Sequence, residues 1–549
     1  MTNWYKNAVI YQIYPQSFND TNNDGIGDIL GIVEKLDYLK YLGIDAIWIS
    51  PMYDSPNYDN GYDVRDYYKL QERYGTDADF DLLIQEAHKR NIKIIMDLVA
   101  NHTSHENPWF LESIQSKDNP KSDWYIWADP KDDGSEPTNW RAIFGGPSWT
   151  YSETRKQYYL HTFSPYQPDL NWKCKEMKKA LFDMVNWWIK RGVDGFRLDA
   201  INFIAKEDFV DGESFGAEYA DIYPFVANKP LSHDYLDELK AACFAPNNSM
   251  TVGEASSAQV SDALYYAQQL DMIFQFEHIA LDGHPTIPWA SQPTDIVKLK
   301  QVLTKWQVEM YGKAWNAIFW ENHDQPRIVT RLGDEGKYRE KSAKMLATCI
   351  YFMQGTPYIY QGQELGSVNT RFYTVDEFKD LEIKNAFKQY VDTGLCSEQV
   401  MLERISRRSR DTGRTPMTWN SSEYAGFSTT SPWIKVNERY SEINVEEQLS
   451  REDSCLNYYK KLFEIRKQIN VITDGQYKLL DEQNPDVFAY IRYNEEESIL
   501  VVCNFRNEEI KFEFDINSID NVILSNDCSS SYLINKILNP FEALVLKLK

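Results

Sequence analysis

The sequence lacks the features that would tie the protein to a membrane or to nucleic acid. The N-terminal segment, Met-Thr-Asn-Trp-Tyr-Lys-Asn-Ala-Val, has no basic head followed by an apolar run, so it does not predict a signal peptide. No apolar run is long enough to cross a bilayer. No basic stripe occurs, and 58 basic against 82 acidic residues give a net charge of −24. This charge argues against nucleic acid or an anionic membrane surface as a partner.

Cysteine is scarce, and no CxxC pair occurs. The seven cysteines are odd in number and widely scattered, at positions 174, 243, 349, 396, 455, 503 and 528. This usage predicts reduced thiols in the cytoplasm rather than a disulfide framework. We therefore expect a soluble cytoplasmic protein, a monomer or weak homo-oligomer, without an organic cofactor.

Apolar and aromatic side chains, in contrast, are abundant. Hydrophobic residues make up 43% of the 549 residues, which is enough for a large core. Aromatic residues make up 14%, with 16 Trp and 36 Tyr. Most of these rings should pack in the core, but flat apolar rings also suit the apolar faces of sugars.

Strand-like and helix-like segments alternate from the N-terminus to about residue 465. Eight short apolar segments predict buried strands: Ala8–Tyr14, Ala46–Ser50, Ile92–Val99, Gly195–Leu198, Thr251–Gly253, Met272–Phe276, Ala317–Trp320 and Thr356–Tyr360. Helices are predicted at Ile29–Leu42, Asp79–Arg90 and Glu176–Lys190, the last with an amphipathic pattern. Eight strands with helices between them predict an α/β fold, a parallel (β/α)8 TIM barrel.

Two parts of the chain depart from this alternation. About seventy residues rich in Trp, Pro, Asn and Asp follow the third strand, far more than an ordinary connection between a strand and a helix. They predict a small inserted subdomain over 103–174, which leaves 1–102 and 175–468 for the barrel. From residue 469 onward, short segments such as Val487–Tyr493 predict strands, so we expect a C-terminal antiparallel β-sandwich domain over 469–549.

Three carboxylates stand at the ends of separate apolar runs. They are Asp199, Glu254 and Asp324. Packing in the apolar core does not explain a carboxylate at the end of a buried strand. In a (β/α)8 barrel such residues collect at one face, where active sites lie. Two carboxylates placed about a sugar are the working groups of a glycosidase.

Seven segments together resemble the α-amylase family, glycoside hydrolase family thirteen, over essentially the whole chain, and within it the oligo-1,6-glucosidase and α-glucosidase subgroup. They are Ala-Val-Ile-Tyr-Gln-Ile-Tyr-Pro (8–15), Asp-Asn-Gly-Tyr-Asp (59–63), Asp-Leu-Val-Ala-Asn-His-Thr (97–103), Gln-Pro-Asp-Leu-Asn-Trp (167–172), Gly-Phe-Arg-Leu-Asp (195–199), Glu-Asn-His-Asp (321–324) and Arg-Asp-Thr-Gly-Arg-Thr-Pro-Met-Thr-Trp (410–419). Each segment alone is weak evidence, but their order and spacing are specific.

The resemblance implies a retaining, exo-acting α-glucosidase that removes glucose from the non-reducing end of short α-1,6- or α-1,4-linked oligosaccharides. Asp199 would be the nucleophile, Glu254 the general acid and then base, and Asp324 the third carboxylate. Arg197 lies two residues before Asp199, so both should face the same way on a strand and Arg197 should keep Asp199 ionised. A drier pocket around Glu254 would complete the separation of the two pKa values.

The resemblance also implies a set of residues that hold the first sugar. His102 and His323 match histidines that contact its hydroxyls, and Asp59 and Arg410 match a pair that closes the far end of its pocket. Tyr62 matches a stacking platform. The pocket walls are expected to include Phe144, Phe163 and Gln167.

A polar loop after the first strand predicts a metal site. Asp20, Asn22, Asp24 and Asp28 place oxygen side chains at alternating positions, and the carbonyl of Ile26 would add a ligand. This spacing resembles an EF-hand calcium loop without its distal Glu. We expect a structural Ca²⁺, or Mg²⁺ in its place; the alternative is a polar turn that Asp28 caps.

The exact substrate stays open. Members of the subgroup that prefer α-1,6 bonds usually carry Val after the nucleophile, and this chain has Ala200. The segment Glu-Ala-Ser-Ser (254–257) also resembles trehalose-6-phosphate hydrolases, but Glu277–Gln292 holds no Lys or Arg for a phosphate. Sucrose hydrolysis or isomerisation is a further alternative. A non-catalytic scaffold of the same superfamily is disfavoured because every catalytic position is filled and no membrane segment is present.

Overall fold

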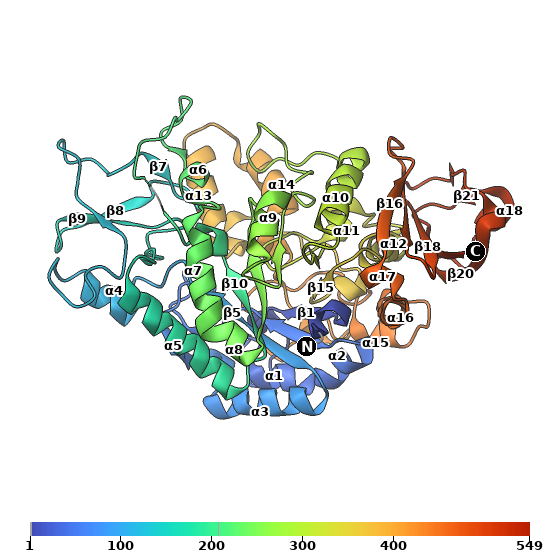
Figure 1. Cartoon of the computed structure of the whole chain (residues 1–549), viewed down its shortest axis with the longest axis horizontal. Helices are drawn as coiled ribbons and strands as arrows, with labels where there is room; N and C mark the ends of the chain where they lie inside the picture. The colour runs from blue at the N-terminus through green and yellow to red at the C-terminus, as the bar shows by residue number, and fades with distance from the viewer. Residues whose placement is uncertain (1–2, 207) are drawn as a thin grey trace.

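Eight short apolar segments form one parallel sheet in the computed structural model, which describes residues 3–206 and 208–549 (Figure 1). In sheet order they are β13 (Met272–Phe274), β12 (Met250–Glu254), β10 (Gly195–Asp199), β5 (Lys93–Val99), β2 (Ala46–Ile49), β1 (Ile10–Ile13), β15 (Thr356–Tyr360) and β14 (Ala317–Ile318). A parallel bridge between Ile273 and Asn316 joins the two ends of this order. The sheet is therefore closed, which confirms the predicted barrel with strands that are shorter at several ends.

The helices that surround the barrel follow from local sequence signals. The main ones are α1 (Ile29–Glu34), α2 (Leu36–Leu42), α3 (Asp77–Lys89), α5 (Lys175–Arg191), α7 (Leu231–Leu239), α9 (Val260–Tyr266), α10 (Ile296–Met310), α12 (Arg339–Tyr351) and α16 (Cys455–Gln468). Gly43 ends α2 in the left-handed conformation, at φ 89°, as its position predicts. The single helix expected over 29–42 is interrupted at Lys35, which has non-helical backbone angles.

Strand residues alternate between the inside of the barrel and the layer beneath the helices. Ile10, Trp48, Ile95 and Phe274 pack together in one buried cluster, whereas their strand neighbours pack in the main core. On β10, Phe196 and Leu198 belong to that main core. With a period of two, Arg197 and Asp199 therefore face the interior of the barrel, as expected.

The segment after β5 forms a small antiparallel sheet of β6 (Trp127–Ala128), β9 (Gln157–Leu160) and β8 (Trp149–Ser152), preceded by α4 (Pro108–Ser113). A fourth strand, β7 (Trp140–Arg141), pairs in parallel with β11 (Ala220–Asp221), which comes from the connection after β10. Figure 1 shows this insert at one end of the molecule and the C-terminal sheet at the other. The insert is thus attached to the barrel at two places along the chain.

Two helices after β15 were not expected from the sequence. α13 (Leu381–Tyr390) and α14 (Glu398–Arg408) share a small core of their own, which includes Phe378, Ile383, Met401 and Ile405. Only residues 391–397 connect them, so their amphipathic faces can fold back on each other. They extend the face of the barrel on which the strands end.

The C-terminal residues form a five-stranded antiparallel sheet in the order β16 (Gln476–Leu480), β17 (Val487–Tyr493), β18 (Ser498–Asn504), β22 (Ala543–Leu548) and β20 (Ile519–Ser525). One face packs on the barrel, where Tyr490 and Cys503 join the main core. The other face is covered by the ladder of β19 (Ile510–Lys511) and β21 (Ile537–Leu538) and by Tyr532. The second layer of the expected sandwich is therefore only a two-stranded ladder. Among the described residues, no helix has the length and apolar character needed to span a membrane.

Candidate active site

The three carboxylates meet at one cavity of about 280 Å³. Asp199 and Glu254 are the last residues of β10 and β12, and Asp324 follows β14 in a short connection. The carboxyl ends of the strands of a parallel barrel meet at one face, which explains how residues far apart in sequence converge. Of the other predicted residues, those that line the cavity are Asp59, Tyr62, His102, Phe144, Phe163 and Arg410. Arg197, Gln167 and His323 contact lining residues from the buried side.

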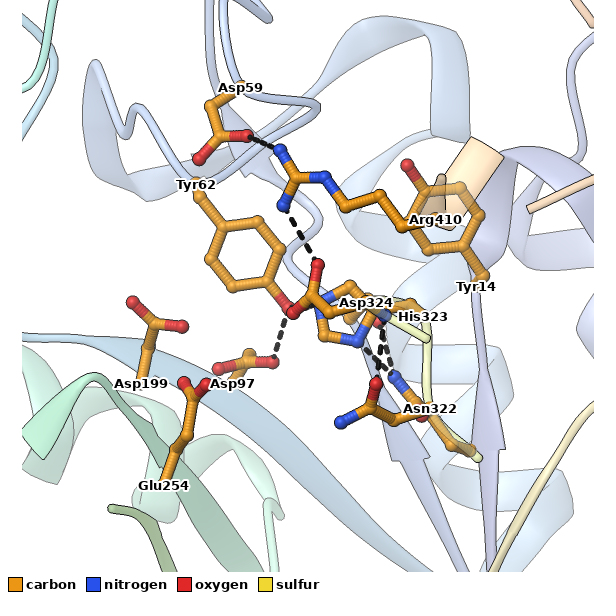
Figure 2. A network of polar contacts seen from close by, with 12 residues as sticks. Tyr14, Asp59, Tyr62, Asp97, Asp199, Glu254, Asn322, His323, Asp324 and Arg410 are labelled. Atoms are coloured by element: carbon orange, nitrogen blue, oxygen red, sulfur yellow. Dashed lines mark hydrogen bonds and ion pairs between the residues drawn. The ribbon is translucent and has the colours of Figure 1, made fainter. Parts of the chain in front are cut away.

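Arg197 holds three carboxylates at once. Its Nη1 donates to Asp97 Oδ1 at 2.8 Å and to Asp199 Oδ1 at 2.6 Å, and its Nη2 donates to Glu254 Oε2 at 2.5 Å. Figure 2 shows the three carboxyl groups facing one another. Arg197 thus contacts Asp199 as expected and binds Glu254 and Asp97 as well. Asp97 is a member of the site that sequence reasoning missed, although it stands in a quoted motif.

The balance of charge in this cluster favours retention of a proton. Burial raises the pKa of Asp199, and the carboxylates of Glu254 and Asp97 raise it further, while Arg197 opposes the shift. Burial also raises the pKa of Asp97 to about 6, against the pull of Arg197. One guanidinium cannot balance the charges of three carboxylates, so Arg197 lowers the pKa of Asp199 without returning it to the ordinary range, contrary to the expectation that Arg197 keeps Asp199 ionised.

This cluster predicts an acidic limit to activity that lies above the ordinary range of a carboxyl group. A nucleophilic Asp199 must be ionised, and burial raises its pKa, so kcat/KM should still rise with pH above the ordinary range of an aspartate instead of levelling off near pH 4. The measurement is a pH profile of kcat/KM on an uncharged substrate. Asp97→Asn removes a charge that raises the pKa of Asp199, so its acidic limb should move to lower pH. A wild-type limb near pH 4 would contradict the raised pKa of Asp199.

Asp324 is held by two arginines at the opposite side of the cavity. Arg410 Nη1 lies 2.8 Å and Arg414 Nη2 2.7 Å from Asp324 Oδ1. Burial works against the charge of Asp324, but these arginines keep its pKa well below the ordinary range. The contacts therefore favour the ionised form of Asp324, which can accept hydrogen bonds from a bound sugar.

A chain of contacts closes one end of the cavity. Arg410 Nη2 lies 3.1 Å from Asp59 Oδ1 (Figure 2). Gln167 Nε2 donates to Asp59 Oδ2 at 3.0 Å. Asp59 and Gln167 are almost completely buried. The predicted pairing of Asp59 with Arg410 is thus present, with Gln167 behind it, and a sugar chain could not pass beyond this point.

The two predicted histidines are buried and neutral. Burial lowers the pKa of His102 to about 4 and that of His323 well below its ordinary value. Gln12 Nε2 lies 2.8 Å from His323 Nδ1, which assigns the proton to Nε2; that atom lies 3.1 Å from Asp324 Oδ2 and 2.6 Å from Tyr62 Oη. The ring of Tyr62 stacks on that of His323, with centroids 5.2 Å apart.

Comparison with known proteins agrees with this geometry. The family model described as the α-amylase catalytic domain matches residues 12–475, and the model of the maltogenic amylase C-terminal domain matches residues 477–522. The chain belongs to the α-amylase family. Its relatives include proteins of at least two activities, so the family alone does not decide the substrate.

Three members of the α-amylase family illustrate this division. The chain is 46% identical over 557 residues to a trehalose-6-phosphate hydrolase of Bacillus subtilis, covering 100% of this chain and 98% of the relative. It is 47% identical over 558 residues to an oligo-1,6-glucosidase of Bacillus cereus, covering 100% and 99%. The crystal structure of a trehalose-6-phosphate hydrolase of Bacillus licheniformis superposes with a TM-score of 0.95 at 45% identity, covering 99% of each chain.

Two acidic residues on the helical addition complete this α-amylase-family site and were not predicted. Asp380 precedes α13 and binds Arg410, with Oδ2 2.6 Å from Nε and Oδ1 2.9 Å from Nη2. Glu382, in the first turn of α13, lines the cavity, and burial together with Asp380 raises its pKa to about 7. Neither residue lies in a segment with a recognisable pattern, and only the folding of α13 onto the barrel reveals them.

Replacement of Asp380 by Asn should weaken the whole Arg410 arrangement. The variant loses the charge of a two-point contact with a buried guanidinium, which also orients Asp59 and Asp324. A hydrogen bond to a charged group contributes about 1.5–3 kcal/mol, so kcat/KM should fall by roughly 10- to 100-fold. Steady-state kinetics on a small glucoside measure this. Asp376→Asn, an acidic residue in the same connection that does not line the cavity, is the matched control.

A buried lysine connects three parts of the chain beneath His102. Lys206 Nζ lies 3.0 Å from Asp169 Oδ2 and donates to Asn101 Oδ1 at 2.6 Å. Asn101 Nδ2 lies 3.2 Å from His102 Nδ1, and Asp169 forms an isolated antiparallel bridge with His102. The ammonium group thus joins the end of β5, the insert and the connection after β10.

The polar loop at residues 20–28 is held together by its own hydrogen bonds. Asp20 accepts from the amides of Asn22, Asn23 and Gly25 and from Ser428 Oγ. Asp28 accepts from Thr21 and caps α1 through the amide of Gly31. Among the described residues, no three His, Cys, Asp or Glu side chains gather closely enough to hold a metal ion. The capped-turn alternative thus accounts for these contacts, and the metal stays a prediction.

Proposed function

We propose that the protein is a retaining, exo-acting α-glucosidase that hydrolyses α-1,6 or α-1,4 bonds of short neutral oligosaccharides from the non-reducing end. The observation that carries this proposal is a cavity that holds Asp199, Glu254 and Asp324 together and is closed at one end by Asp59 and Arg410. A closed pocket admits the end of a chain, which favours release of single glucose units over cleavage inside long chains.

The arrangement supports a two-step reaction. Asp199 attacks the anomeric carbon while Glu254 gives its proton to the glycosidic oxygen, which leaves with the departing sugar. Water then attacks the glucosyl ester of Asp199; Glu254 takes a proton from that water, and the ester bond breaks. Retaining enzymes need two carboxyl groups about 5 Å apart, and the hold of Arg197 on both Asp199 and Glu254 keeps these two groups close.

The charge of the cavity favours a neutral substrate over a phosphorylated one. Its lining includes five carboxylates, at Asp59, Asp199, Glu254, Asp324 and Glu382, and within the described chain Arg410 is its one Lys or Arg side chain. Arg410 is already paired with three of its acidic neighbours. Cations that contact the Glu277–Gln292 segment are committed as well, since Arg331 and Arg408 bind Asp282 and Lys305 binds Glu277. A sugar phosphate would therefore meet repulsion.

Ala200 influences which glycosidic bond, α-1,6 or α-1,4, fits the cavity. It lines the cavity immediately after Asp199, in a left-handed conformation at φ 45°, and its amide donates to Glu254 Oε2 at 3.1 Å. The small side chain leaves space beside the departing sugar, which an α-1,4-linked sugar could occupy. We therefore keep both α-1,6 and α-1,4 bonds within the proposal.

Initial rates of glucose release test the proposal directly. Isomaltose, maltose, trehalose 6-phosphate and sucrose would be compared at equal concentrations. We expect isomaltose or maltose to be cleaved fastest, with α-glucose as the first product seen by proton NMR. Fastest cleavage of trehalose 6-phosphate, or β-glucose as the first product, would overturn the proposal.

We also propose that the loop at 20–28 binds Ca²⁺, or Mg²⁺ in its place, as a structural ion. Support comes from the donor set, since carboxylate, amide and carbonyl oxygens are the ligands that Ca²⁺ prefers. The ion would have to exchange some of the hydrogen bonds that Asp20 and Asp28 now accept. We expect EDTA to lower the melting temperature and added Ca²⁺ to restore it. Equal melting temperatures in EDTA and Ca²⁺ would leave the loop as a capped turn.

A further inference from the structure

A second and larger groove, of about 950 Å³, lies beside the catalytic cavity. On one side it is bounded by the ladder of β7 and β11 and by the residues before β11, and on the other by α13. Its lining includes Arg141, Tyr166, Phe215, Tyr219 and Asn385. No predicted catalytic or substrate residue belongs to this lining, so the groove is distinct from the site described above.

The groove and the catalytic cavity share a thin wall. Phe144 lines the cavity and the next residue, Gly145, lines the groove. On α13, Leu381 faces the groove and Glu382 the cavity. Asn385 Nδ2 donates to the carbonyl oxygen of Phe144 at 2.9 Å, which fastens the two halves of the wall. The groove and the catalytic cavity are therefore immediate neighbours on the two sides of one wall.

The groove exposes large apolar side chains and contains polar side chains that have no partner in the described part of the chain. Phe215 is 88% and Leu395 75% exposed, which is unusual for such large apolar residues. Apolar rings of this kind suit the apolar faces of pyranoses. Arg141, Glu213, Lys388 and Gln389 line the groove, and their side chains make no hydrogen bond or ion pair in the described part of the chain. They are free to exchange hydrogen bonds with hydroxyl groups.

The charge of the groove matches a neutral ligand. Three carboxylates, at Glu213, Glu218 and Asp221, stand against the cations Arg141 and Lys388. A phosphate or a polyanion would require a clear excess of positive charge, and an apolar peptide would leave these charged groups without partners. A neutral oligosaccharide satisfies both the rings and the mixed polar groups.

We infer that this groove binds glucose units of neutral α-gluco-oligosaccharides beyond those held in the catalytic cavity. The inference rests on the proposed function and deepens it, because it makes chain length a property that the protein recognises. The sugar in the groove is either the outer part of the chain whose end occupies the cavity or a second oligosaccharide molecule.

The kinetic test compares short and long substrates on a double variant, Phe215→Ala with Tyr219→Ala. For isomaltopentaose, KM should rise and kcat/KM fall by about five- to tenfold, whereas the constants for isomaltose should stay unchanged. Tyr265→Ala removes a ring that is 60% exposed on α9 and lines neither site, so it is the matched control. A second variant, Gln389→Ala, should change the same constants in the same direction. Equal changes of kcat/KM for isomaltopentaose and isomaltose, or no change for either, would overturn the inference.

A binding test separates this inference from the proposed function and identifies the source of the sugar. Asp199→Asn protein would be titrated with isomaltopentaose by NMR, with and without an iminosugar filling the cavity. Binding that persists with the iminosugar indicates a second molecule, and binding that is lost indicates one continuous chain; in both cases Phe215→Ala with Tyr219→Ala should weaken it. Undiminished binding by that variant would overturn the inference even if hydrolysis is as proposed, and absence of cleavage of both isomaltose and maltose by wild type would overturn the proposed function alone.

Discussion

Replacement of Asp199 by Asn is expected to reduce turnover by about 10⁴-fold or more, the loss seen when a nucleophile that acts as part of a unit is removed. The amide keeps the size of the carboxyl group but cannot form the glycosyl ester. Because burial raises the pKa of Asp199, its charge costs stability at neutral pH, so the variant should melt no lower than wild type. Steady-state kinetics and thermal unfolding measure the two effects.

The companion variant, Glu254→Gln, distinguishes the acid from the nucleophile. A p-nitrophenyl leaving group departs without protonation, so the first chemical step with p-nitrophenyl α-glucoside should be far less impaired than with isomaltose. Asp199→Asn should be equally inactive on both substrates. Surviving activity of Asp199→Asn, or equal losses of both variants on both substrates, would remove the assigned roles.

Replacement of Lys206 by Met should strongly destabilise the protein. The methionine fits the space of the lysine chain but leaves Asp169 buried without its cation, an arrangement that costs about 3–5 kcal/mol. Since Asn101 and His102 belong to the same network, kcat/KM should fall as well. Urea-induced unfolding and kinetics on a small glucoside give the two quantities.

The matched control is the double variant of Lys206→Met with Asp169→Asn. It removes both charges, so it should recover a large part of the lost stability while the activity stays low, because the bridge that positions His102 is altered. If Lys206→Met unfolds at the same urea concentration as wild type, the ion pair between Lys206 and Asp169 does not hold the insert on the barrel.

Much of the catalytic centre could be predicted because its residues lie at strand ends. Asp199, Glu254 and Asp324 stand out in sequence as polar residues that end apolar runs, and the parallel barrel then brings them together. The pairing of Asp59 with Arg410 was predicted only through resemblance, because no local pattern links residues 351 positions apart. Asp97 was overlooked because a single Asp inside an apolar strand offers no sign of its partner.

The residues that sequence reasoning missed depend on tertiary packing. Asp380 and Glu382 reach the cavity only because α13 folds back over the barrel, and the sequence around them has the composition of an ordinary solvent-facing helix. The exposed rings of the groove were unpredictable too, because exposure is a property of the folded surface.

The closure of the barrel has a consequence for motion. Most neighbouring strands share a ladder of several residues, but β13 and β14 meet only at the bridge between Ile273 and Asn316. Asp199 therefore ends a strand that pairs over several residues with both of its neighbours. Asp324, in contrast, follows the two-residue strand β14, which lies at the single-bridge contact. Arg410 and Arg414, not the strand ladder, hold Asp324 in place. Heat that loosens residues 410–414 would separate the third carboxylate from the nucleophile before the barrel unfolds, so loss of activity should precede loss of secondary structure.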